Sequence, residues 1–568
     1  MLVSPAAGQS ISVSNSCRLG LPSGRENDDH PLNYTLIDSP WAFWKAQTWI
    51  TECLSTHTSC QLTPSNFRPT RVLDVRPGKQ NAICLVETSQ KSGAISWAAL
   101  SYVWGGPQLL RTTKHSIQSH YQGINLDDMP QTLVDAVEVC RRISVPYLWV
   151  DSLCIIQDDP NDLEAELGSM AHIYQHAKVT VAAASASSVQ QGFLQNYPLY
   201  YYADRGPPIQ LYHANSETNR PLPGFLLWPG HYSRHEDSDP IFKRAWTYQE
   251  RMLSPRFLQY STGGMLWRCR HHVLSADTKA NLDYFQDNDK LLQMGPSLPG
   301  SNKTMMSSWD DIMKEYSKLS LTYQGDKLNA VAGVAAVYQQ ETGKTYLAGL
   351  WKEDMPWSLA WFSAEHGSKT PRFDEYYVGP SWSWASITSP TRYFGTAKGA
   401  VKTEHASVVH AQIEPLMPGA PLAACKSASL VLRGRLYRAE LRVRVGQWTR
   451  RMTYAVAPGT PFSIEESVLI YPDAWEDGWR DGDDETVVLG EGEDAWLFPL
   501  FTTAKTDMEK GVWTGVVLTK TASTTAGGQP VYRRIALFLK QIWRHHEEAG
   551  GSFGETFAEF EDRDVTIV

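Results

Sequence analysis

The chain has 568 residues, of which 42% are hydrophobic and 11% are aromatic, and its formal net charge is −9 at pH 7. A single hydrophobic core rarely organises a chain of this length, so we expect about two to four domains. Acidic and basic residues are interspersed, which excludes the basic footprint of a nucleic-acid-binding protein.

The first 35 residues are rich in Ser, Gly, Asn and Pro and are predicted to form a flexible arm. They contain neither a basic segment nor an apolar core, so no secretory signal is expected. No window approaches about 18 uninterrupted apolar residues, so no membrane span is expected. The eight cysteines are scattered along the chain, a distribution typical of reduced thiols, and we therefore predict a cytoplasmic protein.

The next segment predicts a helix over residues 40–58, where aromatic residues have helical spacing, and short strands over 70–75 and 82–88. Strands and helices then alternate. The predicted elements are a strand over 95–106, a helix over 129–144, a strand over 146–159, a helix over 160–177 and a strand over 178–186. This alternation predicts an α/β fold with a doubly wound, mainly parallel sheet.

The rest of the chain changes texture. Residues beyond about 195 are loop-rich, 309–364 have a helical pattern, and the sequence after Ser381 is strand-like with turn clusters between the strands. We expect five parts: an arm (1–35), a segment packing on the core (36–90), the α/β core (91–275), a helical region (276–395) and a β-rich C-terminal region (396–568).

Asp151 is a candidate functional residue because it directly follows the apolar run "YLWV". In open parallel sheets, ligands bind beyond the carboxyl ends of strands, and residues 101–106 are expected at the same edge. A helix cap, or a salt bridge to a buried arginine, would account for Asp151 equally well.

Glu250 is the second candidate. Trp246 lies one helical turn before it, and three arginines surround it in sequence: Arg244, Arg251 and Arg256. One interpretation is an exposed helix face on which Glu250 pairs with Arg251 or Arg256, a contact of little energetic value. The other is a carboxylate in an aromatic and cationic pocket that adjusts its pKa.

Metal binding is not predicted, although three residues have a spacing that suits zinc: Cys53, His57 and Cys60. No fourth ligand is close to them in sequence. Residues that can supply one from elsewhere are Cys17 and Cys84, and a separate group comprises Cys269, His271 and His272. Cysteine is often buried without any metal, which favours a plain core role.

Three blocks closely resemble the heterokaryon incompatibility (HET) domain of filamentous fungi: "ALSYVWGG" (99–106), residues 129–186, and "RAWTYQERMLSPRFLQY" (244–260). Further segments, including "WITECLSTHTSC" and "PSWSWAS", resemble the wider architecture of these proteins. The resemblance covers most of residues 45–390.

The resemblance implies a role in allorecognition, in which HET proteins trigger growth arrest and death after fusion of incompatible cells. The domain is remotely similar to TIR domains, which implies a TIR/flavodoxin-like sheet and cleavage of NAD⁺ as a substrate. Glu250 is then the catalytic carboxylate and Trp246 its aromatic wall. Arg244 or Arg251 binds the pyrophosphate. The residues that line the crevice are Ser101, Tyr102, Trp104, Gly105 and Asp151.

Three functions remain open from the sequence. The first is a stand-alone effector that hydrolyses NAD⁺, since the sequence shows no nucleotide-binding oligomerisation module and no repeats. Alternatively, it is a biosynthetic cyclase or isomerase for a small apolar metabolite, with Glu250 or Asp151 as general acid or base. The third option is a non-enzymatic recognition module that assembles into homo-oligomers.

Overall fold

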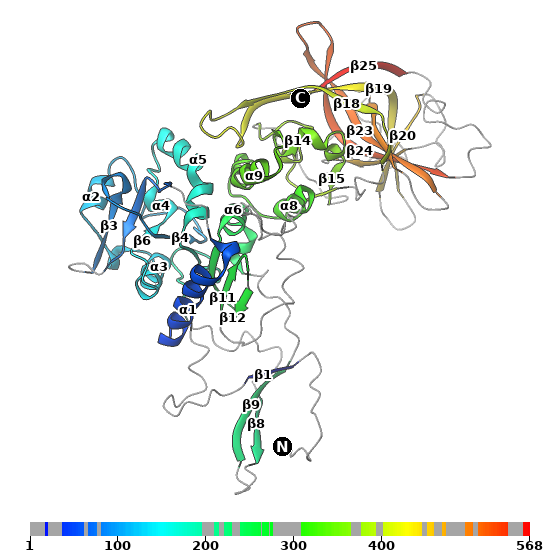
Figure 1. Cartoon of the computed structure of the whole chain (residues 1–568). Helices are drawn as coiled ribbons and strands as arrows, with labels where there is room; N and C mark the ends of the chain where they lie inside the picture. The colour runs from blue at the N-terminus through cyan, green and yellow to red at the C-terminus, as the bar shows by residue number, and fades with distance from the viewer. Residues whose placement is uncertain are drawn as a thin grey trace. The chain divides into compact units, whose positions relative to one another are not determined.

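The computed structural model describes residues 17–20, 37–61, 66–76, 81–195, 209–214, 221–229, 239–262, 264–271, 273–275, 308–364, 377–393, 401–445, 451–458, 468–472, 495–503, 509–543 and 560–568. The chain divides into two compact units, Met1–Met305 and Met306–Val568, and each is considered by itself (Figure 1). The predicted five-part division stays a prediction.

The first unit is built on a mixed sheet with the strand order β12-β11-β10-β7-β4-β6-β2-β3-β5. The parallel strands form its centre: β6 (Tyr147–Trp149), β4 (Trp97–Ser101), β7 (Val179–Ala182) and β10 (Arg256–Ser261). The antiparallel strands flank it: β2 (Arg71–Asp74), β3 (Ala82–Glu87), β5 (Ile124–Asn125), β11 (Gly264–Cys269) and β12 (Val273–Ser275). The predicted α/β fold is confirmed, but the sheet is parallel only at its centre.

The chain crosses the sheet twice around β4. Helix α3 (Gln131–Arg142) connects β4 to β6 on one side, and helix α5 (Pro160–His176) then leads to β7 on the other side of β4. Right-handed crossovers in opposite directions place these helices on opposite faces, as Figure 1 shows. The strand order therefore reverses at β4, and such a switch point opens a crevice at the carboxyl ends of the strands.

The strand predicted over 146–159 is much shorter in the structure. It ends at Trp149, and Asp151–Cys154 form the short helix α4. The Asp151 carboxylate accepts a hydrogen bond from the backbone N–H of Ser152 at 2.6 Å, which favours this turn over a continued strand.

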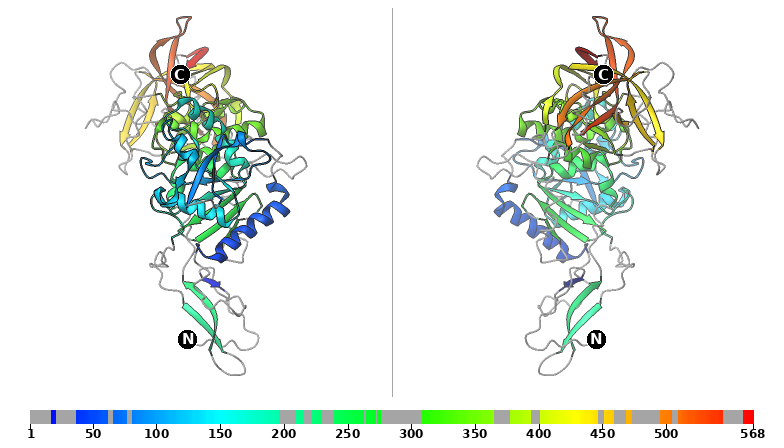
Figure 2. Two further views of the ribbon diagram at one scale, coloured as in Figure 1. Left: turned by 90° about the vertical axis from the view of Figure 1, so that its left-hand side faces the viewer. Right: turned by 90° about the vertical axis from the view of Figure 1, so that its right-hand side faces the viewer.

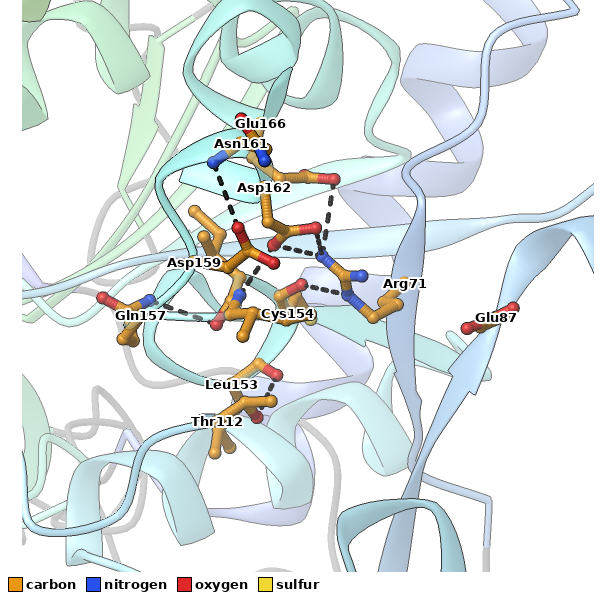
Figure 3. A network of polar contacts seen from close by, with 12 residues as sticks. Arg71, Glu87, Thr112, Leu153, Cys154, Gln157, Asp159, Asn161, Asp162 and Glu166 are labelled. Atoms are coloured by element: carbon orange, nitrogen blue, oxygen red, sulfur yellow. Dashed lines mark hydrogen bonds and ion pairs between the residues drawn. The ribbon is translucent and has the colours of Figure 1, made fainter. Parts of the chain in front are cut away.

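Arg71 connects three elements of this unit (Figure 3). From β2, its Nε donates to the Cys154 carbonyl at the end of α4 at 2.7 Å. Its guanidinium also donates to both oxygens of Asp162 on α5, at 2.6 and 2.5 Å, and lies 3.8 Å from Glu166. The buried arginine thereby holds β2, α4 and α5 together.

Helix α1 (Pro40–Thr56) confirms the helix predicted over 40–58. Ser39 caps it, since its Oγ accepts from the Ala42 N–H at 3.2 Å, and Pro40 occupies the first turn. Trp49 on its buried face stacks on Trp267 of β11 with ring centroids 6.3 Å apart. The helix consequently runs beside the antiparallel edge of the sheet (Figure 2).

A small antiparallel sheet consists of β1 (Cys17–Gly20), β9 (Pro221–Pro229) and β8 (Ile209–Ala214). Four residues of the predicted arm are therefore strand, and the rest of the arm lies outside the described residues. Most of the segment predicted to be loop-rich after residue 195 lies outside them as well.

The second unit begins with α8 (Trp309–Tyr316) and α9 (Asn329–Thr342). The helical prediction for 309–364 is wrong beyond Thr342, because Gly343 ends α9 in the left-handed region at φ 69°. Short strands follow: β13 (Tyr346–Leu347), β14 (Leu350–Trp351), β15 (Trp361–Ser363) and β16 (Thr391–Tyr393). Trp309, Tyr338 and Trp351 pack together with ring centroids 4.9–5.2 Å apart.

The predicted β-rich C-terminal region is confirmed. Its strands are β17 (Val401–Glu404), β18 (Ala406–Pro415), β19 (Cys425–Val445), β20 (Arg451–Val456), β21 (Val468–Pro472), β22 (Ala495–Thr503), β23 (Glu509–Thr524), β24 (Pro530–Trp543) and β25 (Phe560–Ile567). The long strand β19 pairs with β18, β20, β22 and β25, so the sheet curves back on itself.

Arg534 of β24 is fully buried and ties this sheet to the segment before it. Its guanidinium donates to the carbonyls of Leu359 at 2.6 Å and Trp361 at 2.5 Å, and lies 3.6 Å from the Trp361 ring centroid. The β-rich strands and the preceding helical region thus share one compact unit. Within the described residues, every helix is too short or too polar to span a membrane.

Candidate functional site

The candidate site lies where the segments after β4 and β6 meet helix α6 (Ala245–Leu253). Strand β4 ends at Ser101 and β6 at Trp149, and both are parallel neighbours at the switch point of the sheet. The structure therefore brings together Tyr102 and Asp151, as the sequence predicted for residues at strand ends.

Asp151 is fixed by three hydrogen bonds. The Tyr102 hydroxyl donates to its Oδ1 at 2.9 Å, the Trp104 indole N–H donates to its Oδ2 at 2.9 Å, and the Ser152 N–H completes the set. Burial raises the pKa of Asp151, while these donors and the positive charge of Arg244 lower it. In the described residues Asp151 makes no salt bridge. It instead locks the segment after β4 to the start of α4.

Glu250 is 6% exposed on the inner face of α6. Its Oε2 and the Oγ of Ser101 are both buried without a hydrogen-bond partner among the described residues. Burial raises the pKa of Glu250 to about 8; the charge of Asp151 also raises it, whereas the Ser101 and Tyr174 hydroxyls and Arg244 lower it. Ser101 is near enough to affect the carboxyl group without meeting ordinary hydrogen-bond geometry. Glu250 is thus largely protonated at neutral pH.

The three neighbouring arginines have different surroundings. Arg244 precedes the first turn of α6, and its charge lowers the pKa of both Glu250 and Asp151. Arg251 lies over the rings of Phe242 and Tyr248, at 5.1 and 5.8 Å from their centroids. Arg256 donates to backbone carbonyls of Lys178 and Cys60. The structure therefore does not support an exposed ion pair of Glu250 with Arg251 or Arg256.

Gly105 has a structural reason to be glycine. Its φ is +72°, and an added Cβ would lie 2.2 Å from the Cβ of Ser188. Only glycine allows the segment after β4 to approach residues 187–188 so closely. Trp246, the predicted aromatic wall, is partly exposed in the first turn of α6, and its role beside Glu250 stays a prediction.

Tyr174 is a site residue that the sequence did not indicate. It lies on α5, its hydroxyl donates to the Leu100 carbonyl at 3.0 Å, and it lowers the pKa of Glu250. A tyrosine in a predicted helix does not by itself indicate a functional site. Tyr174 comes close to Glu250 only because the strand order places α5 over β4. Solvent reaches the site where three of its residues are partly exposed: Trp104, Asp151 and Arg244.

Two carboxyl groups of this kind, Glu250 buried and Asp151 partly exposed, can do acid–base or electrostatic chemistry. Asp151 is held by its donors, and one oxygen of Glu250 has no hydrogen-bond partner in the part of the chain that the structure describes. A carboxyl group with a pKa near neutrality can give or take a proton, and its ionised form can stabilise a positive charge that develops on a substrate. The catalytic roles predicted for Glu250 and Asp151 stay predictions.

Comparisons with known proteins point to one family. The model of the family "Heterokaryon incompatibility protein (HET)" matches residues 97–250, from the first residue of β4 to Glu250. The chain is also 28% identical over 124 residues to "Heterokaryon incompatibility protein 6, OR allele" of Neurospora crassa. That match covers 20% of this chain and 18% of the relative, so it spans about a fifth of the relative's length. No solved structure matches the chain.

Proposed function

Because residues 97–250 form a heterokaryon incompatibility (HET) domain, we propose that this protein acts in heterokaryon incompatibility as an effector of cell death that hydrolyses NAD⁺. One observation carries the chemical part of the proposal. Glu250 is buried at the switch point of the sheet, beside Asp151, with one carboxyl oxygen that has no partner in the described residues. TIR-like chemistry requires a single glutamate of this kind.

The charge of the substrate suits this site. Hydrolysis breaks the bond between the pyridinium nitrogen of nicotinamide and C1′ of the ribose, and the bonding electrons leave with the nitrogen. Positive charge develops on the ribose, water adds to C1′ and a proton is released. Since an adjacent cation favours the ionised form of a carboxyl group, a bound pyridinium ribosyl group would ionise Glu250, and the carboxylate would stabilise the oxocarbenium-like transition state.

The neighbouring residues have matching proposed roles. Tyr102 and Trp104 hold Asp151, whose negative charge adds to the effect of burial in raising the pKa of Glu250. Arg244, partly exposed at the start of α6, is suited to the pyrophosphate. A cytoplasmic location would supply NAD⁺ and would suit the seven cysteines from Cys53 to Cys425, which form no disulfide.

The test is nicotinamide release from NAD⁺ by the purified full chain, with a crowding agent present to promote assembly. Glu250→Gln keeps the shape of the side chain and is expected to lower turnover by about 100-fold or more. Glu166→Gln is the matched control, since Glu166 is also a buried glutamate of the first unit but lies beside Arg71. Equal turnover in wild type and Glu250→Gln would exclude Glu250 as the catalytic group.

The pKa of about 8 also favours a second function, a cyclase or isomerase for a small apolar metabolite, because a protonated Glu250 is a general acid at neutral pH. That function predicts no NAD⁺ turnover and a metabolite conversion that Glu250→Gln abolishes. If Glu250→Gln leaves cell death unchanged, the HET domain acts by recognition or assembly alone.

A further inference from the structure

Four potential metal ligands converge where helix α1 meets strand β11. Cys53 lies in the last turn of α1, His57 directly follows the helix, Cys60 lies in the turn Thr58–Cys60, and Cys269 ends β11. Their sulfur and ring-nitrogen atoms all lie within 4.8 Å of one another. Cys53 and Cys60 are fully buried, and His57 is 7% exposed.

The distances within this Cys₃His cluster suit one metal ion at its centre. Nδ1 of His57 lies 3.5 Å from the sulfur of Cys269 and 4.0 Å from that of Cys60. Tetrahedral zinc, with Zn–S bonds of about 2.3 Å, places its ligand atoms roughly 3.5–3.8 Å apart. These three cysteines form no disulfide, so their proximity does not come from a covalent bond.

Local structure preorganises the first three ligands. Cys53 and His57 are four residues apart, so the helix brings their side chains to the same face. The His57 N–H still donates to the Cys53 carbonyl at 3.3 Å, and the Cys60 N–H donates to the His57 carbonyl at 3.0 Å. These bonds fold the chain back so that Cys60 points at the same space.

The sheet supplies the fourth ligand. Cys269 pairs with Arg256 across β11 and β10, and Nη1 of Arg256 donates to the Cys60 carbonyl at 2.9 Å. Nη1 of Arg270 donates to the Ser59 carbonyl at 3.3 Å. Arg256 of β10 and Arg270, which directly follows β11, thus hold the Ser59–Cys60 turn against Cys269. Cys269 lies 212 residues from His57 along the chain.

We propose that this cluster is a structural zinc site in which three thiolates and the His57 imidazole bind one Zn²⁺ ion. Ordinary core packing explains buried cysteines one at a time, but it does not explain an imidazole nitrogen directed among three sulfurs. Three Cys and one His complete a tetrahedral set, which leaves no position for a substrate, so the site is structural rather than catalytic. The metal fastens α1 to the edge strands of the sheet.

Metal content of the purified full chain tests the proposal. Wild type is expected to hold one zinc per chain by plasma mass spectrometry, and Cys269→Ala to hold less than about a tenth of that. Cys140→Ala is the control, because Cys140 is a buried cysteine of α3 outside the cluster and its variant is expected to keep the metal. Wild type without zinc after zinc-supplemented expression, or zinc retained in Cys269→Ala, would overturn the proposal, and so would iron in place of zinc.

Two further measurements remain decisive if Cys269→Ala does not fold. His57→Cys keeps four ligands and is expected to retain zinc. Wild type reconstituted with Co²⁺ is expected to show thiolate-to-metal charge transfer and the intense visible bands of tetrahedral cobalt. A weak octahedral cobalt spectrum would overturn the assignment of the ligands.

Discussion

At the scale of single residues, two buried glutamates of the first unit show how neighbouring charges change the pKa of a buried carboxyl group. Glu166 is 1% exposed and burial raises its pKa, but the guanidinium of Arg71, 3.8 Å away, lowers it. Glu250 is 6% exposed and has the negatively charged Asp151 as a neighbour, with Arg244 as a partly exposed cation. The pKa of Glu250 therefore rises to about 8. A general acid or base works best when its pKa is close to the surrounding pH, which is near neutral in most cells.

The raised pKa of Glu250 predicts a pH-dependent stability. Its folded-state pKa of about 8 lies above the ordinary value of 4.5, so between these pH values the unfolded chain releases a proton that the folded chain keeps. Stability from this group is complete below about pH 4.5 and is lost as the pH rises through about 8. Glu250→Gln removes the effect. We expect the variant to be about 2–4 kcal/mol more stable than wild type at pH 9 and equal to it near pH 4.

Denaturant unfolding of both proteins from pH 4 to 9 measures this difference. Glu166→Gln serves as the comparison: burial also raises the pKa of Glu166, but Arg71 opposes that rise, so the variant should gain less stability at high pH than Glu250→Gln does. A stability difference between Glu250→Gln and wild type that is constant with pH would contradict the raised pKa.

At the scale of elements, the first unit depends on polar contacts as well as on apolar packing. Arg71 of β2 joins α4 through the Cys154 carbonyl and α5 through Asp162. The short helix α4 begins with Asp151, so this network also supports the candidate site. Removing one partner of a buried ion pair lowers the free energy of unfolding, because the remaining charge stays buried and water cannot replace the lost partner.

Arg71→Met is expected to destabilise the first unit by about 3–5 kcal/mol, because Asp162 and Glu166 lose the buried cation beside them. Arg76→Met is the matched control. Arg76 also pairs with an aspartate, Asp74, but its side chain is 58% exposed, so the cost should be about 0–1 kcal/mol. Denaturant titrations followed by tryptophan fluorescence measure both, and equal effects would show that burial does not decide the value of these ion pairs.

At the scale of the whole molecule, the chain forms two compact units that divide between Met305 and Met306. The first is an α/β sheet with its candidate site, and the second combines α8 and α9 with the curved β-rich sheet. Each has its own buried core, and each contains a buried arginine that joins several segments, Arg71 in the first and Arg534 in the second. Units of this kind commonly unfold as separate cooperative transitions.

Calorimetry of the full chain is therefore expected to show two transitions. Arg534→Met leaves the carbonyls of Leu359 and Trp361 without their donor and should lower the transition of the second unit by several degrees. Arg71→Met should lower the other transition. If each substitution shifts both transitions equally, the chain unfolds as one cooperative unit.

The sequence by itself determined the class of the fold and several of its elements. Alternating apolar patterns predicted α3, α5 and the strands β4 and β7, because burial of one helix face or a whole strand leaves a periodic trace. The position of a carboxylate directly after an apolar strand indicated Asp151, and the HET resemblance indicated Glu250.

Only the tertiary structure decided which distant residues meet. Hydrophobic periodicity does not record whether neighbouring strands run parallel or antiparallel, so the antiparallel edges of the sheet were not predicted. Tyr174 influences Glu250, and Cys269 joins His57, through distances that depend on the order of strands in the sheet. Which residues are buried, which charges are neighbours and which side chains can share a metal ion all depend on distances in space. The sequence determines these distances only through the complete fold.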